Sequence, residues 1–137
     1  HGGGWKRLHD SRVDNLSFKK SLNEFGILKV YDYYGMIEQT GSIFVECEKG
    51  YLHCSDYSDI IVRDELTLDA LNFNEQGILQ VLSLLPSSYP GNSILTEDIG
   101  TIIGEDDCKC GKKGKYFLVS GRMKQSEIRG CSDTRTV

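Results

Sequence analysis

The sequence predicts an α+β fold in which strands outweigh helix. One segment near the start has helical spacing, whereas many later segments are short, rich in β-branched or aromatic residues and separated by turn residues. The chain has 137 residues, the size of a single domain or part of one. We therefore expect one helix followed by a mainly β arrangement.

The helix is predicted from three apolar residues spaced along one helical face: Phe18, Leu22 and Phe25. Asp14 or Ser17 can cap its start, and Gly26 stands where a left-handed residue would end it. The simplest interpretation is that this apolar face packs against the core.

The expected strands follow the helix directly. Residues 27–31 and 78–85 are apolar enough to be buried, and 86–92 should be a loop because its two prolines cannot donate to a ladder. Gly50 marks a hairpin turn. The remaining predicted strands are 42–47, 52–54, 59–63, 94–95, 99–103 and 116–119.

Composition limits the possible partners. Sixteen Lys and Arg against twenty Asp and Glu give a net charge of −4, which argues against a nucleic-acid partner. No apolar run approaches the ~20 residues that span a bilayer. The start at His1 has neither Met nor an apolar signal segment, so we expect a cytoplasmic protein and a piece of something larger.

Cysteine spacing indicates a metal site. The chain has five cysteines, an odd number, and in a reducing compartment thiols bind metal, react or are simply buried. Cys108 and Cys110 lie in a Cys-x-Cys-Gly turn, and Cys47 and His53 flank the expected hairpin turn. Together they would form a Cys₃His zinc site, although Cys54 competes with Cys47 or His53 as a ligand.

Three further segments carry a family resemblance: 33–41 (YYGMIEQTG), 95–100 (LTEDIG) and 120–130 (SGRMKQSEIRG). In this order and spacing they resemble adenylate-forming enzymes. The chain is most similar to the LuxE-type acyl-protein synthetases and their relative phenylacetate-CoA ligase, and the run at 129–134 (RGCSDT) favours the former. The resemblance implies the C-terminal part of an adenylate-forming, acyl-CoA synthetase-like large domain.

The resemblance also divides the chain in two. Residues 1–41 would hold the glycine turn, helix, strand and nucleotide loop, and residues 42–137 the β-rich part, the zinc knuckle and an acyl-acceptor tail. The implied activity is ATP-dependent activation of a long-chain fatty acid, or another carboxylic acid, as acyl-adenylate. The acyl group would then pass to an enzyme thiol and onward to an acyl-CoA or fatty-acid reductase.

Nucleotide contacts are implied for both parts of the chain. In the first part, Gly3 and Gly4 would let the backbone approach the adenine, Tyr34 would stack on it beside Gly35, and Glu38 would hold Mg²⁺ at the ATP phosphates.

In the second part, three more residues match the family's nucleotide motifs. Asp98 would bind the ribose hydroxyls of ATP and AMP, and Arg122 would join it there. Lys124 takes the family's hinge position between two catalytic poses.

Two cysteine functions follow from the resemblance. Zinc held by Cys47, His53, Cys108 and Cys110 would be structural, because no position is left for water. Cys131 would be the thiol that accepts the acyl group.

The chain also departs from the family pattern. Ile37 stands where Thr or Ser is common, and Glu97 replaces Gly in the usual Thr-Gly-Asp. We find no Gly/Ser/Thr-rich phosphate loop, so the isolated fragment should be inactive. The alternatives are an acyl- or aryl-CoA ligase, or a non-enzymatic zinc-stabilised β module.

Overall fold

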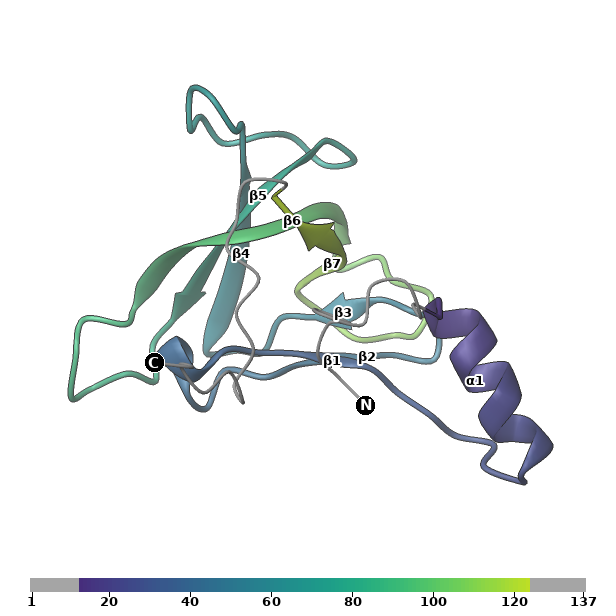
Figure 1. The fold of residues 1–137 in the computed structure, drawn as a ribbon. Coiled ribbons are helices and arrows are strands. Elements are labelled where there is room, and N and C mark those ends of the chain that lie inside the picture. The colour runs from purple at the N-terminus through teal and green to yellow at the C-terminus, as the bar shows by residue number, and fades with distance from the viewer. Residues whose placement is uncertain (1–12, 124–137) are drawn as a thin grey trace, which may run out of the picture.

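A computed structural model describes residues 13–123 of the chain. These residues form one curled antiparallel sheet of seven strands with little helix, so the β-weighted α+β class is confirmed (Figure 1). The elements are α1 (Asn15–Glu24), β1 (Tyr33–Tyr34), the 3-10 helix η2 (Ile37–Gln39), β2 (Phe44–Glu46), β3 (Leu52–His53), β4 (Ser58–Arg63), β5 (Gln76–Ser83), β6 (Ser93–Glu105) and β7 (Lys115–Arg122). Their order in the sheet is β1-β2-β3-β7-β6-β5-β4.

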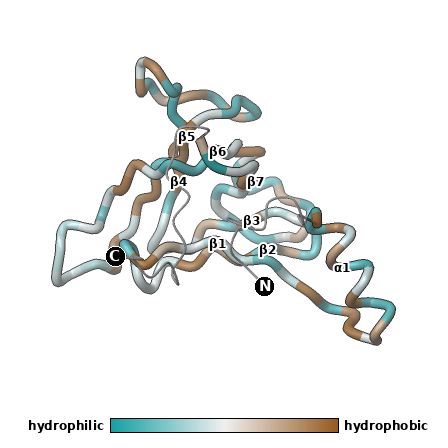
Figure 2. The backbone as a smooth tube through the Cα atoms, in the orientation of Figure 1, coloured by the Kyte–Doolittle hydropathy of each residue, from teal (hydrophilic) through white to brown (hydrophobic). Residues whose placement is uncertain are grey.

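One core joins the short strands β1–β3 to the long strands β4–β7. The rings of Phe44 and Phe117 meet edge to face with centroids 5.2 Å apart. Apolar residues of β4 and β5 continue this core, and both strands include apolar stretches in Figure 2. The buried cluster is Phe44, Leu52, Ile60, Val62, Leu79, Val81, Ile102 and Phe117.

The β6 strand is one element where the sequence predicts two. It runs unbroken through the polar triplet 96–98, because the side chains along it alternate between the core and the outer face. Its pairing with β7 shifts at two glycines, between Ile99 and Gly100 and again between Ile102 and Gly104. Its pairing with β5 shifts across the polar triplet 96–98, because Ile78 faces Ile99 whereas Gln80 faces Leu95. A Cβ at Gly100 would lie 2.5 Å from the Leu118 carbonyl oxygen, which explains the glycine there.

The ends of α1 agree with the sequence. Asp14 is the N-cap and its Oδ1 accepts a hydrogen bond from the Ser17 amide at 3.0 Å. Gly26 has φ +82° just beyond the last turn, a conformation that favours glycine.

The burial of α1 is a correction. No residue of the helix is buried, and Phe25 at its end is 82% exposed, so the apolar face does not pack into the described core. Polar contacts to β2 hold the helix instead. The buried Glu46 carboxylate forms an ion pair with Lys19 and accepts a hydrogen bond from Asn15 Nδ2 at 3.2 Å. Figure 1 shows the rest of α1 projecting from the sheet.

Residues 27–31 are a second correction, because they form no strand and Leu28 is 79% exposed. Pairing begins only at β1, where Tyr33 faces Val45 and Tyr34 faces Phe44. An apolar run makes a strand only where a partner strand lies beside it, and no described strand pairs with 27–31.

The described residues include no helix long and apolar enough to cross a membrane.

We predict that Phe117→Ala lowers the free energy of unfolding by about 3–5 kcal/mol, because it leaves a cavity where the ring contacts Phe44. Leu66→Ala is the control, since Leu66 is 93% exposed and should change stability by no more than about 0.5 kcal/mol. Urea denaturation measures both, and equal effects would contradict the core described above.

Candidate functional site

Three residues from distant parts of the chain meet at one end of the sheet. Tyr34 donates its phenolic hydrogen to Asp98 Oδ2 at 2.7 Å, and Arg122 Nε lies 3.3 Å from Asp98 Oδ1. Asp98 therefore joins β1 to β7 through its two oxygens. We call Tyr34, Asp98 and Arg122 the Asp98 triad.

Strand register explains the convergence. Asp98 on β6 faces Arg122 on β7 across the antiparallel ladder. The Asp98 amide donates to Thr96 Oγ1 at 3.0 Å, and Thr96 Oγ1 in turn donates to the Leu79 carbonyl of β5 at 2.8 Å. The polar triplet 96–98 is thus fixed by its own side chains.

The Tyr34 phenol is a neutral donor. Its ring packs edge to face against Phe117, with centroids 6.2 Å apart. Burial first, and then the charge of Asp98, raise the pKa of Tyr34 well above the ordinary value. The hydroxyl therefore keeps its proton and orients the carboxylate.

Arg122 has a second partner, Glu97, which the sequence shows only as a departure from the family's Thr-Gly-Asp pattern. Its guanidinium contacts Glu97 Oε2 at 2.7 Å as well as Asp98. The Glu97 side chain is 54% exposed, so this pair contributes little to stability. It does hold the guanidinium beside Asp98.

Glu38 lies apart from the triad, in η2 on the loop that follows β1. Its side chain is exposed, and only its backbone carbonyl is held, by the Tyr89 hydroxyl at 2.6 Å. Gly35 stands between Tyr34 and this loop, and a Cβ there would lie 3.2 Å from the Ser42 carbonyl oxygen. The structure does not bring the Glu38 carboxylate into contact with the triad residues.

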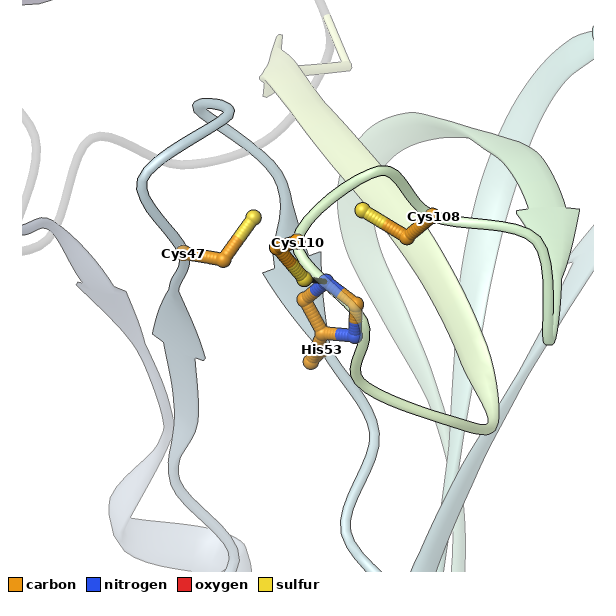
Figure 3. A group of neighbouring side chains, drawn as sticks. All are labelled: Cys47, His53, Cys108 and Cys110. Carbon is orange, nitrogen blue, oxygen red and sulfur yellow. Dashed lines mark hydrogen bonds between the residues drawn. The ribbon is translucent and has the colours of Figure 1, made fainter.

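A second cluster lies at the turn between β6 and β7. One ligand atom from each of Cys47, His53, Cys108 and Cys110 lies within 4.8 Å of the other three. Figure 3 shows the side chains of the two turns gathered in one place. Gly50 and Gly111, at φ +83° each, shape the two turns that present them.

The cluster suits a tetrahedral zinc ion. His53 Nε2 lies 3.4 Å from Cys110 Sγ, close to the ~3.5 Å between nitrogen and sulfur ligands at tetrahedral zinc. Burial, with Lys112 nearby, lowers the pKa of His53, so the ring is neutral, as a metal ligand must be. Burial also raises the pKa of the Cys108 thiol. A metal would have to displace that proton.

The structure separates Cys54 from this cluster, although the sequence left it as a competing ligand. The Cys54 side chain packs against the hydrophobic core, and burial raises the pKa of its thiol to about 12. Among the described residues the possible ligand set is therefore Cys47, His53, Cys108 and Cys110.

Four residues with predicted roles lie outside the described residues: Gly3, Gly4, Lys124 and Cys131.

Comparison with known proteins decides the family. The family model described as acyl-protein synthetase, LuxE, matches residues 1–136. The chain belongs to the LuxE family. No curated protein matches it.

Solved structures similar to this LuxE-family chain include MatB from Rhodopseudomonas palustris. The ATP-bound form is 19% identical with a TM-score of 0.47, and the apo form is 19% identical with a TM-score of 0.48. The alignments cover 68% and 69% of this chain but 20% and 21% of the MatB chains. The LuxE-family chain thus spans about a fifth of their length.

Sequence reasoning missed two residues that hold the Glu38 loop. Gln39 is wholly buried, and Tyr89 reaches the Glu38 carbonyl across 51 residues of sequence. A glutamine within a polar loop and a tyrosine between prolines both look like surface residues, so only a known contact between the loops could have identified them.

We predict that Tyr34 stays protonated at pH values where ordinary tyrosines, with a pKa of ~10, have ionised. Asp98→Asn should lower its pKa by removing a neighbouring negative charge, but not to the ordinary value, because burial remains the larger cause. NMR titration of ring-labelled tyrosine measures both. An unchanged pKa in the variant would show that the hydroxyl does not face the carboxylate.

Proposed function

We propose that this chain is the C-terminal part of an ATP-dependent acyl-protein synthetase that activates a long-chain fatty acid. The observation that carries the proposal is the LuxE family match over residues 1–136. The Asp98 triad supports it, because a carboxylate ordered by a phenol and a guanidinium can accept the two hydroxyl hydrogens of a ribose.

The proposed reaction has two steps. A carboxylate oxygen of the fatty acid attacks the α-phosphorus of ATP and pyrophosphate leaves, which gives the acyl-adenylate. The Cys131 thiolate then attacks the acyl carbon and AMP leaves, which gives a thioester. Transfer of the acyl group to a reductase would follow.

Residues of this chain have separate roles in that proposal. Asp98 and Arg122 hold the ribose, and Tyr34 orders Asp98 and presents its ring to the adenine. Glu38, whose side chain is exposed on η2, is the ligand proposed for Mg²⁺ at the phosphates. Gly3, Gly4 and Gly35 would let the backbone approach the nucleotide, and Lys124 would be the hinge.

We also propose structural zinc at Cys47, His53, Cys108 and Cys110. Three thiols and one imidazole would fill a tetrahedral shell and leave no open position for catalysis. The ion would tie the β2–β3 turn to the β6–β7 turn, two segments that are far apart in sequence.

The activity is tested on the full-length protein with fatty acid, ATP and Mg²⁺. We expect acid-dependent exchange of pyrophosphate into ATP, and hydroxylamine-sensitive acyl label on the protein without CoA. Cys131→Ala should abolish the label and leave the exchange intact. If AMP is released only when CoA is present, the protein is instead a CoA ligase. If the protein holds zinc but binds no nucleotide, it is a non-enzymatic binding module.

For the ribose site we predict that Asp98→Asn lowers kcat/KM for ATP about tenfold to a hundredfold, because charge-assisted hydrogen bonds to the sugar are lost. Asp56→Asn is the matched control: Asp56 is exposed in a turn and should leave the exchange rate unchanged. Equal kcat/KM values for the two variants would show that Asp98 does not bind the ribose.

For the metal we predict one zinc ion per chain, measured by elemental analysis of the purified protein. Cys108→Ser should lose the metal and unfold at lower temperature, because metal binding and folding are coupled. Cys54→Ser is the control, since Cys54 packs against the core outside the cluster, and it should keep its zinc. Full zinc content in Cys108→Ser would contradict the ligand set.

A further inference from the structure

The loop that carries Glu38 is held from its buried side by Gln39. The Gln39 side chain is 0% exposed, and its Nε2 donates to the Gly91 carbonyl at 2.8 Å and to the Val81 carbonyl at 3.2 Å. Val81 belongs to β5, and Gly91 to the loop at 86–92. One amide therefore joins η2 to two segments that are distant in sequence.

Tyr89 holds the same loop from the other direction. Its hydroxyl donates to the Glu38 carbonyl at 2.6 Å. A Cβ at Gly91 would lie 2.3 Å from Tyr89 Cε2, so the ring packs directly over the Gly91 backbone. The Gly91 carbonyl is also the one that receives Gln39 Nε2. The Gln39 and Tyr89 contacts thus both rest on the Gly91 backbone, which is their common support.

That support is itself anchored to the sheet. The Ser83 amide donates to the Asn92 carbonyl at 2.9 Å, which closes the 86–92 loop onto the end of β5. The Ser42 hydroxyl donates to Ser83 Oγ at 2.6 Å and attaches the far end of the Glu38 loop to the same strand. Gln39 at the end of η2 and Ser42 just after it therefore both attach the Glu38 loop to β5.

Packing alone does not explain a glutamine at this position. Gln39 Oε1 is buried and has no hydrogen-bond partner among the described residues, which is unfavourable. An apolar side chain of similar size would fill the same volume without that cost, but it could not bind the two carbonyls. The Glu38 carboxylate, by contrast, has no hydrogen bond or ion pair within residues 13–123.

We propose that Gln39 and Tyr89 are positioning residues that hold the Glu38 backbone so that its carboxylate is already placed for a divalent cation. The proposal rests on the proposed function, in which Glu38 binds Mg²⁺ at the ATP phosphates. A loop that is correctly placed only part of the time binds its cation more weakly, in proportion to that fraction. We call the hydrogen bonds of Gln39 and Tyr89 to this part of the chain the clamp. Weakening the clamp should therefore raise the Mg²⁺ concentration that the reaction requires.

The test measures pyrophosphate exchange against Mg²⁺ concentration in the full-length protein. In Tyr89→Phe, which keeps the ring and removes one hydroxyl, the Mg²⁺ concentration for half-maximal rate should rise about threefold to tenfold. The rate at saturating Mg²⁺ should stay within about twofold of the original, because the cation itself then orders the loop. Gln39→Met should act in the same direction.

Tyr57→Phe is the matched control, because Tyr57 is 59% exposed and lies in the turn before β4. It should leave both quantities unchanged. A lower saturating rate with an unchanged Mg²⁺ requirement would mean that the clamp only supports folding, and would overturn the proposal. If Gln39→Met does not fold, Tyr89→Phe decides alone. No exchange in the unaltered protein would reject the proposed function instead, which keeps the two failures distinct.

Discussion

The antiparallel pairing of β6 with β7 is the constraint on which both candidate sites depend. At the open end of this hairpin the ladder sets Asp98 opposite Arg122, and at the closed end the turn presents Cys108 and Cys110. Asp98 and the last residue of β6 are seven positions apart, so roughly 20 Å of strand separates the two sites. A metal at the turn could therefore affect the Asp98 triad only by stabilising the hairpin.

The short strands β1–β3, which lie on the β7 side of the hairpin, supply the remaining residues of both the Asp98 triad and the metal cluster. β3 pairs with β7, which sets His53 opposite Tyr116 and brings the β2–β3 turn to the cysteine knuckle. β1 reaches the other end through the Tyr34 hydroxyl. The β2–β3 hairpin thus contributes Cys47 and His53 to the metal cluster, and β1 contributes Tyr34 to the triad. Their shared packing between Phe44 and Phe117 couples the clusters to one core.

Local chemistry could be predicted from the sequence, whereas long-range burial could not. The caps of α1, the hairpin at Gly50 and the Cys-x-Cys-Gly turn follow from neighbouring residues, and all three are present. The exposure of α1, the missing strand at 27–31 and the continuity of β6 depend on which segments lie alongside. Gln39 is the clearest case, because its two partners lie 42 and 52 residues away.

The charges around Arg122 also give a reason for the unusual Glu97. One guanidinium faces two carboxylates, Glu97 and Asp98, and Tyr34 adds no charge because its phenol stays protonated. Within the described residues this group of side chains is therefore negative, which would repel phosphate but suits a sugar whose hydroxyls donate hydrogen bonds. A carboxylate has roughly four acceptor positions, and Tyr34 and Arg122 occupy two on Asp98, so two remain for such hydroxyls. Under the proposed function, the phosphates of a bound nucleotide would therefore lie away from the triad, toward Glu38.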